Sequence, residues 1–236
     1  RPQSTIAVLC PESLAPLWQS MPELNEVMVY PDKTSARQIA KLLEEHELTF
    51  ESAICWEASD AASAFQRVGI LQRLGYPAKG LEKNLTDPVV VVIEPGPIEH
   101  RVRYYLNLVE KLGGNPFVRA SFQTPALPAA PAKVRIALAP YSEFGTTHQW
   151  PLVRYQEVVN AMEEIHGAGS IDWVILNSGD KSALTSELAT ILDGRAKDCS
   201  QEWGMAQNLT ELPPCSALLS CDNGLAHLAA YVGLPA

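Results

Sequence analysis

The sequence predicts an α/β protein with two domains, each built around a parallel sheet. Strand-like and helix-like segments alternate in two series, and a stretch rich in proline and alanine at residues 115–133 separates them. Such alternation is typical of parallel strands joined by right-handed crossover helices. The stretch between the series has neither a helical nor a strand period, so we interpret it as a semi-rigid linker. We therefore expect an N-terminal domain at 1–114 and a C-terminal domain at 134–236.

The first domain is predicted to open with an apolar strand that Pro11 ends. Apolar side chains on one face indicate a helix at 34–46, with Thr34 as its cap. Gly113 and Gly114 are expected to stop the last helix of this domain. The predicted strands are 5–10, 26–30 and 52–56, and the predicted helices are 13–20, 34–46, 60–74 and 99–112.

The second domain repeats the pattern, and a polar loop at 140–149 follows its first strand. The next helix has Pro151 at its first position, where the missing N–H costs nothing. The predicted strands are 134–139, 171–176, 196–199 and 216–220, and the predicted helices are 151–166, 181–192, 205–212 and 224–232. Ligands of such folds bind at the carboxyl ends of the strands. Neither the dinucleotide-binding fingerprint nor a P-loop motif is present in the sequence.

Composition and charge narrow the class of partner. The chain has 236 residues, of which 47% are hydrophobic and 19% charged, as in ordinary globular domains. Its apolar runs are far shorter than the ~20 residues of a membrane helix. A net charge of −9 disfavours nucleic-acid binding and tight adhesion to an anionic membrane. The chain starts without a signal peptide, and its abrupt start and stop suggest that the native protein extends at both ends.

The five cysteines are widely and irregularly spaced, with neither a C-x-x-C pair nor a Cys/His cluster. A zinc site is therefore not expected. We predict buried free thiols in a reducing compartment, which points to the cytoplasm.

A first candidate site lies where an apolar strand meets an alanine-rich helix, at Asp222-Asn223-Gly224. Asp222 is expected to cap the helix, while the N–H groups of Asn223, Gly224 and Leu225 and the helix dipole offer a place for a diphosphate. His227 could donate to a phosphate oxygen. The alternatives are a plain turn with Asp222 only as a cap, and a packed histidine.

A second candidate site is the loop between the first strand and first helix of the C-terminal domain. It is rich in hydrogen-bond donors suited to phosphate, namely Ser142, Thr146, Thr147 and His148. The alternative is an ordinary solvated loop with Trp150 packed as a hydrophobic staple.

Together these two segments resemble glycosyltransferase family 9, the ADP-heptose:lipopolysaccharide heptosyltransferases. Members carry a phosphate loop ending in basic-x-Trp-Pro and a later Asp-[Thr/Ser]-Gly-x-x-His-x-Ala-Ala. The matching segments here are Glu143-Phe144-Gly145, His148-Gln149-Trp150-Pro151 and Asp222-Asn223-Gly224-Leu225-Ala226-His227-Leu228-Ala229-Ala230. Segments of the first half, Gly75 to Gly80, Leu85 to Pro88 and His100 to Leu106, resemble the heptosyltransferase II branch.

The resemblance implies the GT-B arrangement, in which two Rossmann-like domains face a cleft. It also implies an ADP-heptose donor, a lipopolysaccharide inner-core or other glycan acceptor, and inversion without a metal or cofactor. The donor-binding residues it implies, together with those read from the loops, are Ser142, Glu143, Thr146, Thr147, His148, Asp180, Asp222, Asn223, Gly224, Leu225 and His227. Asp180 would bind the ribose, although a plain turn at that position is the alternative.

Three differences separate the sequence from the family pattern. His148 stands where members place a lysine, and Asn223 replaces threonine or serine. The family's catalytic base is an aspartate on a first strand that precedes the first residue of this chain, so the catalytic residue is unknown here. Two alternatives to a transferase follow: a nucleotide-sugar-binding protein without turnover, and another sugar-nucleotide enzyme such as an epimerase. In each case we expect a cytoplasmic protein with at most peripheral contact with the inner face of the membrane.

Overall fold

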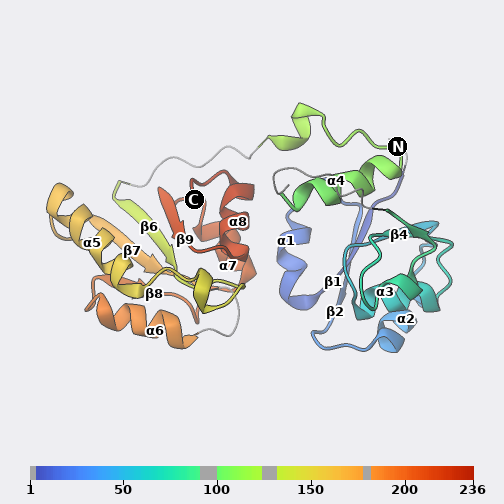
Figure 1. Cartoon of the computed structure of the whole chain (residues 1–236), viewed down its shortest axis with the longest axis horizontal. Coiled ribbons are helices and arrows are strands. Elements are labelled where there is room, and N and C mark those ends of the chain that lie inside the picture. Colours follow the sequence, from blue (N-terminus) through green and yellow to red (C-terminus); the bar gives the residue numbers. More distant parts are fainter. Residues whose placement is uncertain (1–3, 91–99, 124–131, 178–181) are drawn as a thin grey trace. The chain divides into compact units, whose positions relative to one another are not determined.

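The computed structural model describes residues 4–90, 100–123, 132–177 and 182–236. The chain divides into two compact units, Arg1–Phe122 and Gln123–Ala236. Each unit alternates parallel strands with helices, as the sequence predicts (Figure 1). No helix in these ranges is both long and apolar enough to cross a bilayer.

In the described part of unit 1, five strands form two groups. Its elements are β1 (Ala7–Pro11), η1 (Glu12–Leu14), α1 (Ala15–Gln19), β2 (Glu26–Tyr30), α2 (Ala36–Glu44), β3 (Ser52–Cys55), α3 (Asp60–Arg67), β4 (Gln72–Gly75), η2 (Glu82–Asn84), β5 (Asp87–Pro88), α4 (Val102–Lys111) and η3 (Arg119–Phe122). Strand β1 pairs with β2, and β3, β4 and β5 form a second parallel sheet. We expected one sheet, but among the described residues no ladder hydrogen bonds join the two groups.

Helices α2 and α3 cover a core formed by Met28, Ile39, Leu43 and Ala64. The predicted Thr34 cap of α2 is wrong, because the N-cap is Ser35. The Ser35 N–H donates to Oε1 of Gln38 at 3.1 Å, which satisfies a backbone donor that the helix leaves unpaired.

The predicted helix at 60–74 is also wrong in its second half. Helix α3 ends at Arg67, Gly69 turns the chain with φ +74°, and β4 begins at Gln72. The apolar residues after Gly69 suggested one more helical turn. Instead, Leu74 pairs with Ile54 of β3 and packs into a core with Val89 and Leu108, so burial in the sheet outweighs the local helical pattern.

This correction can be tested at Gly69. In a continuous helix Gly69→Ala would stabilise the protein. At a φ of +74° alanine is strained, so we expect a loss of about 1 kcal/mol in the free energy of unfolding measured with urea. Gly69→Asn should cost less, because asparagine tolerates the left-handed region better. A stabilising Gly69→Ala would contradict the turn.

Unit 2 forms one four-stranded parallel sheet. Its elements are β6 (Val134–Ala139), η4 (Thr146–His148), α5 (Leu152–His166), β7 (Ile171–Ile175), α6 (Ser182–Ile191), β8 (Ala196–Asp198), α7 (Met205–Glu211), β9 (Ala217–Ser220) and α8 (Gly224–Val232). The strand order is β8-β7-β6-β9. The chain thus leaves β6 towards β7 on one side and returns to the other side of β6 as β9.

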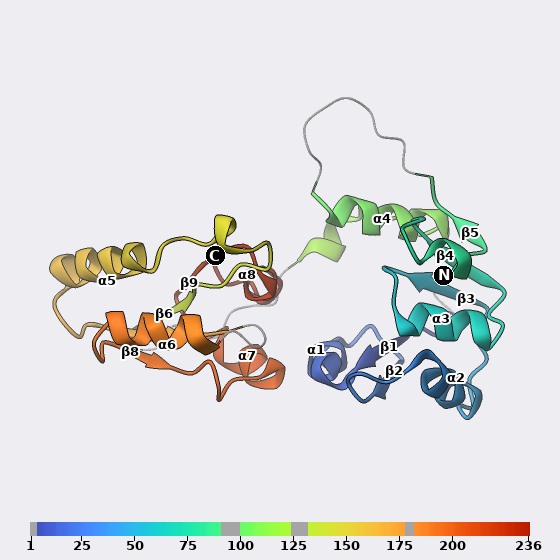
Figure 2. The same ribbon diagram turned by 60° about the horizontal axis from the view of Figure 1, so that its bottom comes forward.

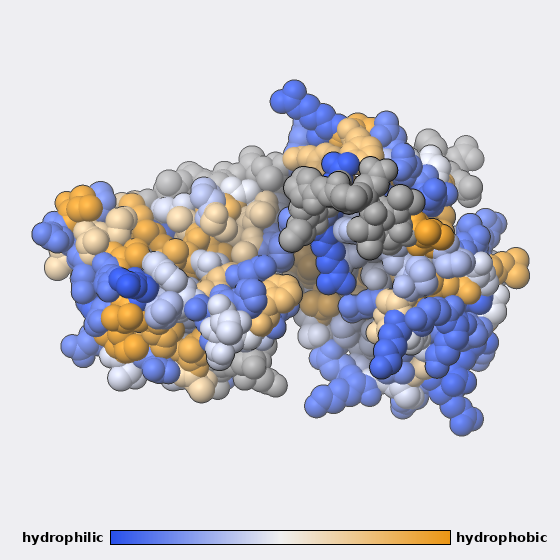
Figure 3. Space-filling model, in the orientation of Figure 1, coloured by the Kyte–Doolittle hydropathy of each residue, from blue (hydrophilic) through white to orange (hydrophobic). Residues whose placement is uncertain are grey.

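Helices α5 and α6 pack on one face of this sheet (Figure 2). Alternate residues of β7, Ile171, Trp173 and Ile175, are buried against fully buried Tyr155 and Leu188 from these helices. Burial of each large apolar side chain contributes about 1.5–3 kcal/mol. At the surface, hydrophobic and hydrophilic residues are interspersed over the visible face of unit 2 (Figure 3). Pro151, predicted as the first helical residue, is instead the extended N-cap of α5, with ψ 134°.

Candidate functional site

The strand order of unit 2 places a topological switch point between β6 and β9. In open α/β sheets ligands bind outside the carboxyl ends of the two strands at such a point. The ladder between them runs to Ala139 opposite Ser220. The two loops that the sequence singled out, after Ala139 and after Ser220, therefore start side by side.

Asn223 joins these two loops and caps α8. Its Oδ1 accepts the N–H groups of Leu225 at 2.9 Å and Ala226 at 3.3 Å, while its Nδ2 donates to the Tyr141 carbonyl at 2.6 Å. The side chain is only 2% exposed. The prediction that Asp222 caps the helix is therefore wrong. Leu225 N–H is already satisfied by Asn223, which leaves Asn223 and Gly224 as the N–H groups with no acceptor among the described residues.

Asp222 is exposed and holds the other loop through its backbone. Its carbonyl accepts the N–H of Glu143 at 3.3 Å. Its carboxylate lies 3.8 Å from Nε2 of His227, and the two side chains are 63% and 66% exposed. Both side chains can therefore reach a ligand in solvent.

Gly224 and Glu143 meet at the start of α8. A Cβ at position 224 would lie 3.7 Å from Oε1 of Glu143. The carboxylate thus sits beside the positive end of the helix, where a negative charge is favoured. Glu143 and Asp222 together add negative charge next to the free N–H groups.

The remaining residues of the 140–149 loop differ in how far they are buried. Ser142 is fully buried, and its Oγ accepts the N–H of Phe144 at 3.2 Å. Gly145 takes φ +90°, which turns the chain into η4. The predicted phosphate contacts Thr146, Thr147 and His148 form η4 and are all exposed. Leu225 is buried, and Asp180 lies outside the described residues.

One group at this site was not predicted: the thiol of Cys221, with Tyr155 and Trp150 around it. The Tyr155 hydroxyl lies 3.4 Å from Cys221 Sγ, and the backbone N–H of Trp150 donates to the same sulfur at 3.3 Å. Burial, followed by the hydrogen bond to Cys221, raises the pKa of Tyr155, so it stays a neutral hydroxyl. Local sequence patterns carry no signal for this cluster, because Tyr155 and Trp150 lie 66 and 71 residues before Cys221.

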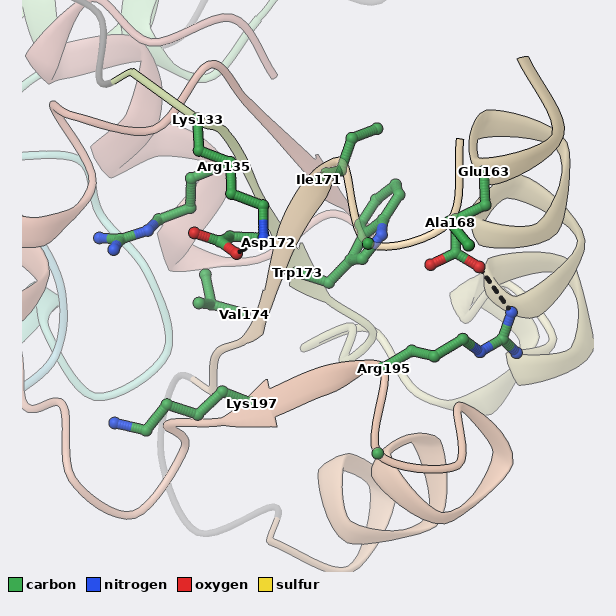
Figure 4. A pocket seen from close by; sticks show the side chains of 12 residues that line it. Lys133, Arg135, Glu163, Ala168, Ile171, Asp172, Trp173, Val174, Arg195 and Lys197 are labelled. Atoms are coloured by element: carbon green, nitrogen blue, oxygen red, sulfur yellow. Dashed lines mark hydrogen bonds and ion pairs between the residues drawn. The ribbon is translucent and has the colours of Figure 1, made fainter. Parts of the chain in front are cut away.

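A hollow of unit 2 lies at the opposite, amino-terminal edge of the sheet (Figure 4). Its four basic side chains are each matched by an acid, which leaves little net attraction for an anion. The pairs are Lys133–Asp172 at 2.5 Å, Arg195–Glu163 at 3.3 Å, Arg135–Glu211 at 3.4 Å and Lys197–Glu202 at 3.1 Å.

Unit 1 carries an aromatic cluster beyond the carboxyl end of β3. Trp56, 45% exposed, meets Tyr105 of α4 edge-on with the ring centroids 5.2 Å apart. The guanidinium of Arg101 lies 5.7 Å from the Tyr105 ring centroid. Arg101 and Tyr105 lie in the segment that resembles the heptosyltransferase II branch, but their grouping with Trp56 was not predicted, since Trp56 and Tyr105 belong to different elements.

The cysteines match their prediction, because all five are free and buried. Burial raises the pKa of Cys55 and of Cys215 to about 11, so these thiols are protonated and inert at neutral pH. Among the described residues no group of three or more His, Cys, Asp or Glu side chains could hold a metal ion.

Three solved structures have a similar architecture. E. coli ADP-heptose lipopolysaccharide heptosyltransferase II aligns over 100% of this chain and 75% of its own, with a TM-score of 0.70 and 19% identity. A family 9 glycosyl transferase from Veillonella parvula aligns over 99% and 71%, with a TM-score of 0.78 and 14% identity. The E. coli heptosyltransferase WaaC with ADP aligns over 98% and 86%, with a TM-score of 0.61 and 15% identity.

The chain has the fold of the family 9 heptosyltransferases. This confirms the predicted α/β fold class and the resemblance in fold. No family model and no curated protein matches the sequence. At such low identities the structural alignments show the heptosyltransferase-like fold alone. The chemistry of this chain has to be argued from its own residues.

Proposed function

We propose that the protein is a glycosyltransferase that uses a nucleotide-diphosphate sugar. The observation that carries the proposal is the start of α8 at the β6–β9 switch point. Its Gly224 N–H has no acceptor among the described residues, and the turn before it is hydrogen-bonded to the loop that carries the exposed, donor-rich η4. Backbone N–H groups and the positive end of a helix dipole stabilise a diphosphate as charge builds on it during departure of the sugar.

Within this proposal the donor is ADP-heptose, and the acceptor is a sugar of the lipopolysaccharide inner core. The heptosyltransferase-like fold supports that donor, since solved relatives in fold are an ADP-heptose enzyme and an enzyme with ADP. The Trp56–Tyr105 pair with Arg101 suits an acceptor sugar that bears an anionic group, because aromatic rings cover apolar sugar faces and guanidinium binds carboxylate or phosphate.

We further propose that transfer inverts the anomeric carbon and needs neither metal nor cofactor. The N–H groups of Asn223 and Gly224 and the exposed side chains of Thr146, Thr147 and His148 would take the place of a cation around the diphosphate. Transfer by the full-length protein should therefore persist in excess chelator, and a loss of activity that Mg²⁺ restores would contradict this part of the proposal. We place the protein in the cytoplasm with at most peripheral membrane contact.

The test is calorimetric titration of the full-length protein with ADP and ADP-heptose, followed by a transfer assay with a lipopolysaccharide core acceptor. Binding of both nucleotides and release of ADP would support the proposal. If neither nucleotide binds, the proposal fails.

A second candidate is a binding protein that keeps the nucleotide site without turnover. It is favoured by the two exposed carboxylates, Asp222 and Glu143, beside α8 and by histidine in place of lysine at position 148. Binding of ADP-heptose without transfer would select it over the first.

Position 148 offers a direct test of the phosphate loop. An added permanent cation should offset the two carboxylates, so we expect His148→Lys to tighten ADP binding about fivefold at low salt and less at high salt. Thr190→Lys adds the same charge near the end of α6, at the opposite edge of the sheet, and should change little. Equal effects of the two variants, or no effect of His148→Lys, would show that η4 does not contact phosphate.

A further inference from the structure

Cys221 is the residue that connects β9 to the Asp222–Asn223 turn, and its sulfur touches three separate parts of unit 2. Sγ lies 3.4 Å from the Pro140 carbonyl oxygen, 3.3 Å from the Trp150 backbone nitrogen and 3.4 Å from the Tyr155 hydroxyl. The residue is 7% exposed. By contrast, the thiol of Cys215, also buried, donates to the carbonyl oxygen of Glu211, four residues away, at 3.3 Å.

These contacts form a consistent set of hydrogen bonds. A neutral thiol has one weak donor and can accept. Pro140 has only a carbonyl to offer, so the thiol hydrogen points to it, and Trp150 N–H donates to the sulfur. The Tyr155 hydroxyl lies 3.4 Å from both Sγ and the Ala139 carbonyl and can donate to either.

The backbone of Cys221 is hydrogen-bonded to the sheet. Cys221 N–H donates to the Ala139 carbonyl at 3.1 Å, which extends the β6–β9 pairing one residue beyond Ser220. One sulfur atom therefore fixes the beginning of the 140–149 loop through Pro140, its end through Trp150, and the start of the Asp222–Asn223 turn through the chain itself. A site that is anchored to rigid strands in this way keeps its geometry better than one built on loops alone.

We propose that Cys221 is a positioning residue of the donor site, which holds the two phosphate-binding loops in register through its thiol. This inference rests on the proposed function. Cys221 contacts no ligand in the proposal, and it acts through the Pro140 carbonyl and the Trp150 N–H. An alanine at this position would leave both groups without their sulfur partner, so that only the Asn223–Tyr141 and Glu143–Asp222 hydrogen bonds described above would remain to hold the loops in register.

The experiment compares Cys221→Ala, Cys221→Ser and the control Cys215→Ala in the full-length protein. We expect Cys221→Ala to weaken ADP binding about tenfold, the equivalent of one or two lost hydrogen bonds. Cys221→Ser keeps a donor and an acceptor and should recover most of the affinity. Cys215→Ala removes an equally buried thiol and should lower the melting temperature without changing ADP affinity. In transfer assays the Cys221→Ala loss should fall on KM for the donor rather than on kcat.

Equal ADP affinity for Cys221→Ala and Cys215→Ala would overturn the positioning role, as would a Cys221→Ser variant as weak as Cys221→Ala. Hydrogen exchange on the unliganded variants gives a readout that does not need the proposed function. Amides of 141–150 and 222–226 should exchange faster in Cys221→Ala than in Cys215→Ala. If the wild type binds no ADP, the proposed function fails, while unchanged exchange in Cys221→Ala would sink the positioning role itself.

Discussion

Replacement of Asn223 by alanine is expected to weaken ADP binding about 100-fold in the full-length protein, the equivalent of two or three lost hydrogen bonds at about 1 kcal/mol each. The physical reason is that one buried side chain does two tasks. It caps α8 through Leu225 and Ala226, and it holds the 140–149 loop through the Tyr141 carbonyl. Loss of the cap alone should cost about 1 kcal/mol in stability. Calorimetry with ADP and thermal unfolding of the same samples would measure the two effects.

Two further substitutions separate the cap from the link between loops. Asn223→Ser keeps an oxygen that can accept the helix N–H groups but loses the Nδ2 donor to Tyr141, so its ADP affinity should fall between wild type and Asn223→Ala. Asn223→Asp also keeps the cap, yet it turns an acceptor towards the Tyr141 carbonyl and adds a third negative charge near Glu143 and Asp222. We expect it to bind ADP no better than alanine. Wild-type affinity in Asn223→Ala would show that the diphosphate binds elsewhere.

Asn223 also illustrates how far the sequence could go at the site. The motif located the turn at the carboxyl end of a strand, and it indicated correctly that a cap and free N–H groups would lie there. It could not show which of two neighbouring residues is the cap. Both Asp222 and Asn223 have a side-chain oxygen of the right kind. The choice depends on the Tyr141 carbonyl, which lies 82 residues away in the chain and offers a partner only to an amide N–H.

The fold, too, could be predicted where local sequence decides the structure and not where contacts with distant residues decide it. Strands made mostly of apolar residues, such as 26–30 and 134–139, have the predicted bounds, because a run of apolar β-forming residues is a local signal. The prediction failed at Gln72–Gly75, where the strand QRLG is mostly polar and short. Its pairing with β3 is decided by contacts with residues distant in sequence, which local periodicity does not record. The Cys221 cluster was invisible for the same reason.

That short strand carries the largest stability effect that we predict. In the β3–β4 pairing Gly75 lies opposite Cys55, and a Cβ at position 75 would lie 2.5 Å from the Cys55 carbonyl oxygen and 3.0 Å from Leu85 Cδ2. A backbone oxygen within a sheet cannot move aside without breaking the ladder. Gly75→Ala should therefore lower the free energy of unfolding by about 3 kcal/mol, at the upper end of the usual cost of overpacking.

Gly114→Ala is the comparison variant, because the atom nearest its Cβ would belong to a side chain, Val109 Cγ1 at 2.8 Å, while the nearest backbone atom, the Val109 carbonyl oxygen, would lie 3.1 Å away instead of 2.5 Å. We expect it to cost about 1 kcal/mol. Urea unfolding of the two variants beside wild type makes the comparison, and equal costs would contradict the β3–β4 register.

Gly75 also precedes Tyr76, whose hydroxyl donates to the Tyr104 carbonyl of α4 at 2.8 Å. Tyr105 of the proposed acceptor contact lies in α4, and Arg101 is the N-cap of this helix. Gly75→Ala at temperatures below unfolding should therefore impair use of the acceptor more than binding of ADP, which we assign to unit 2.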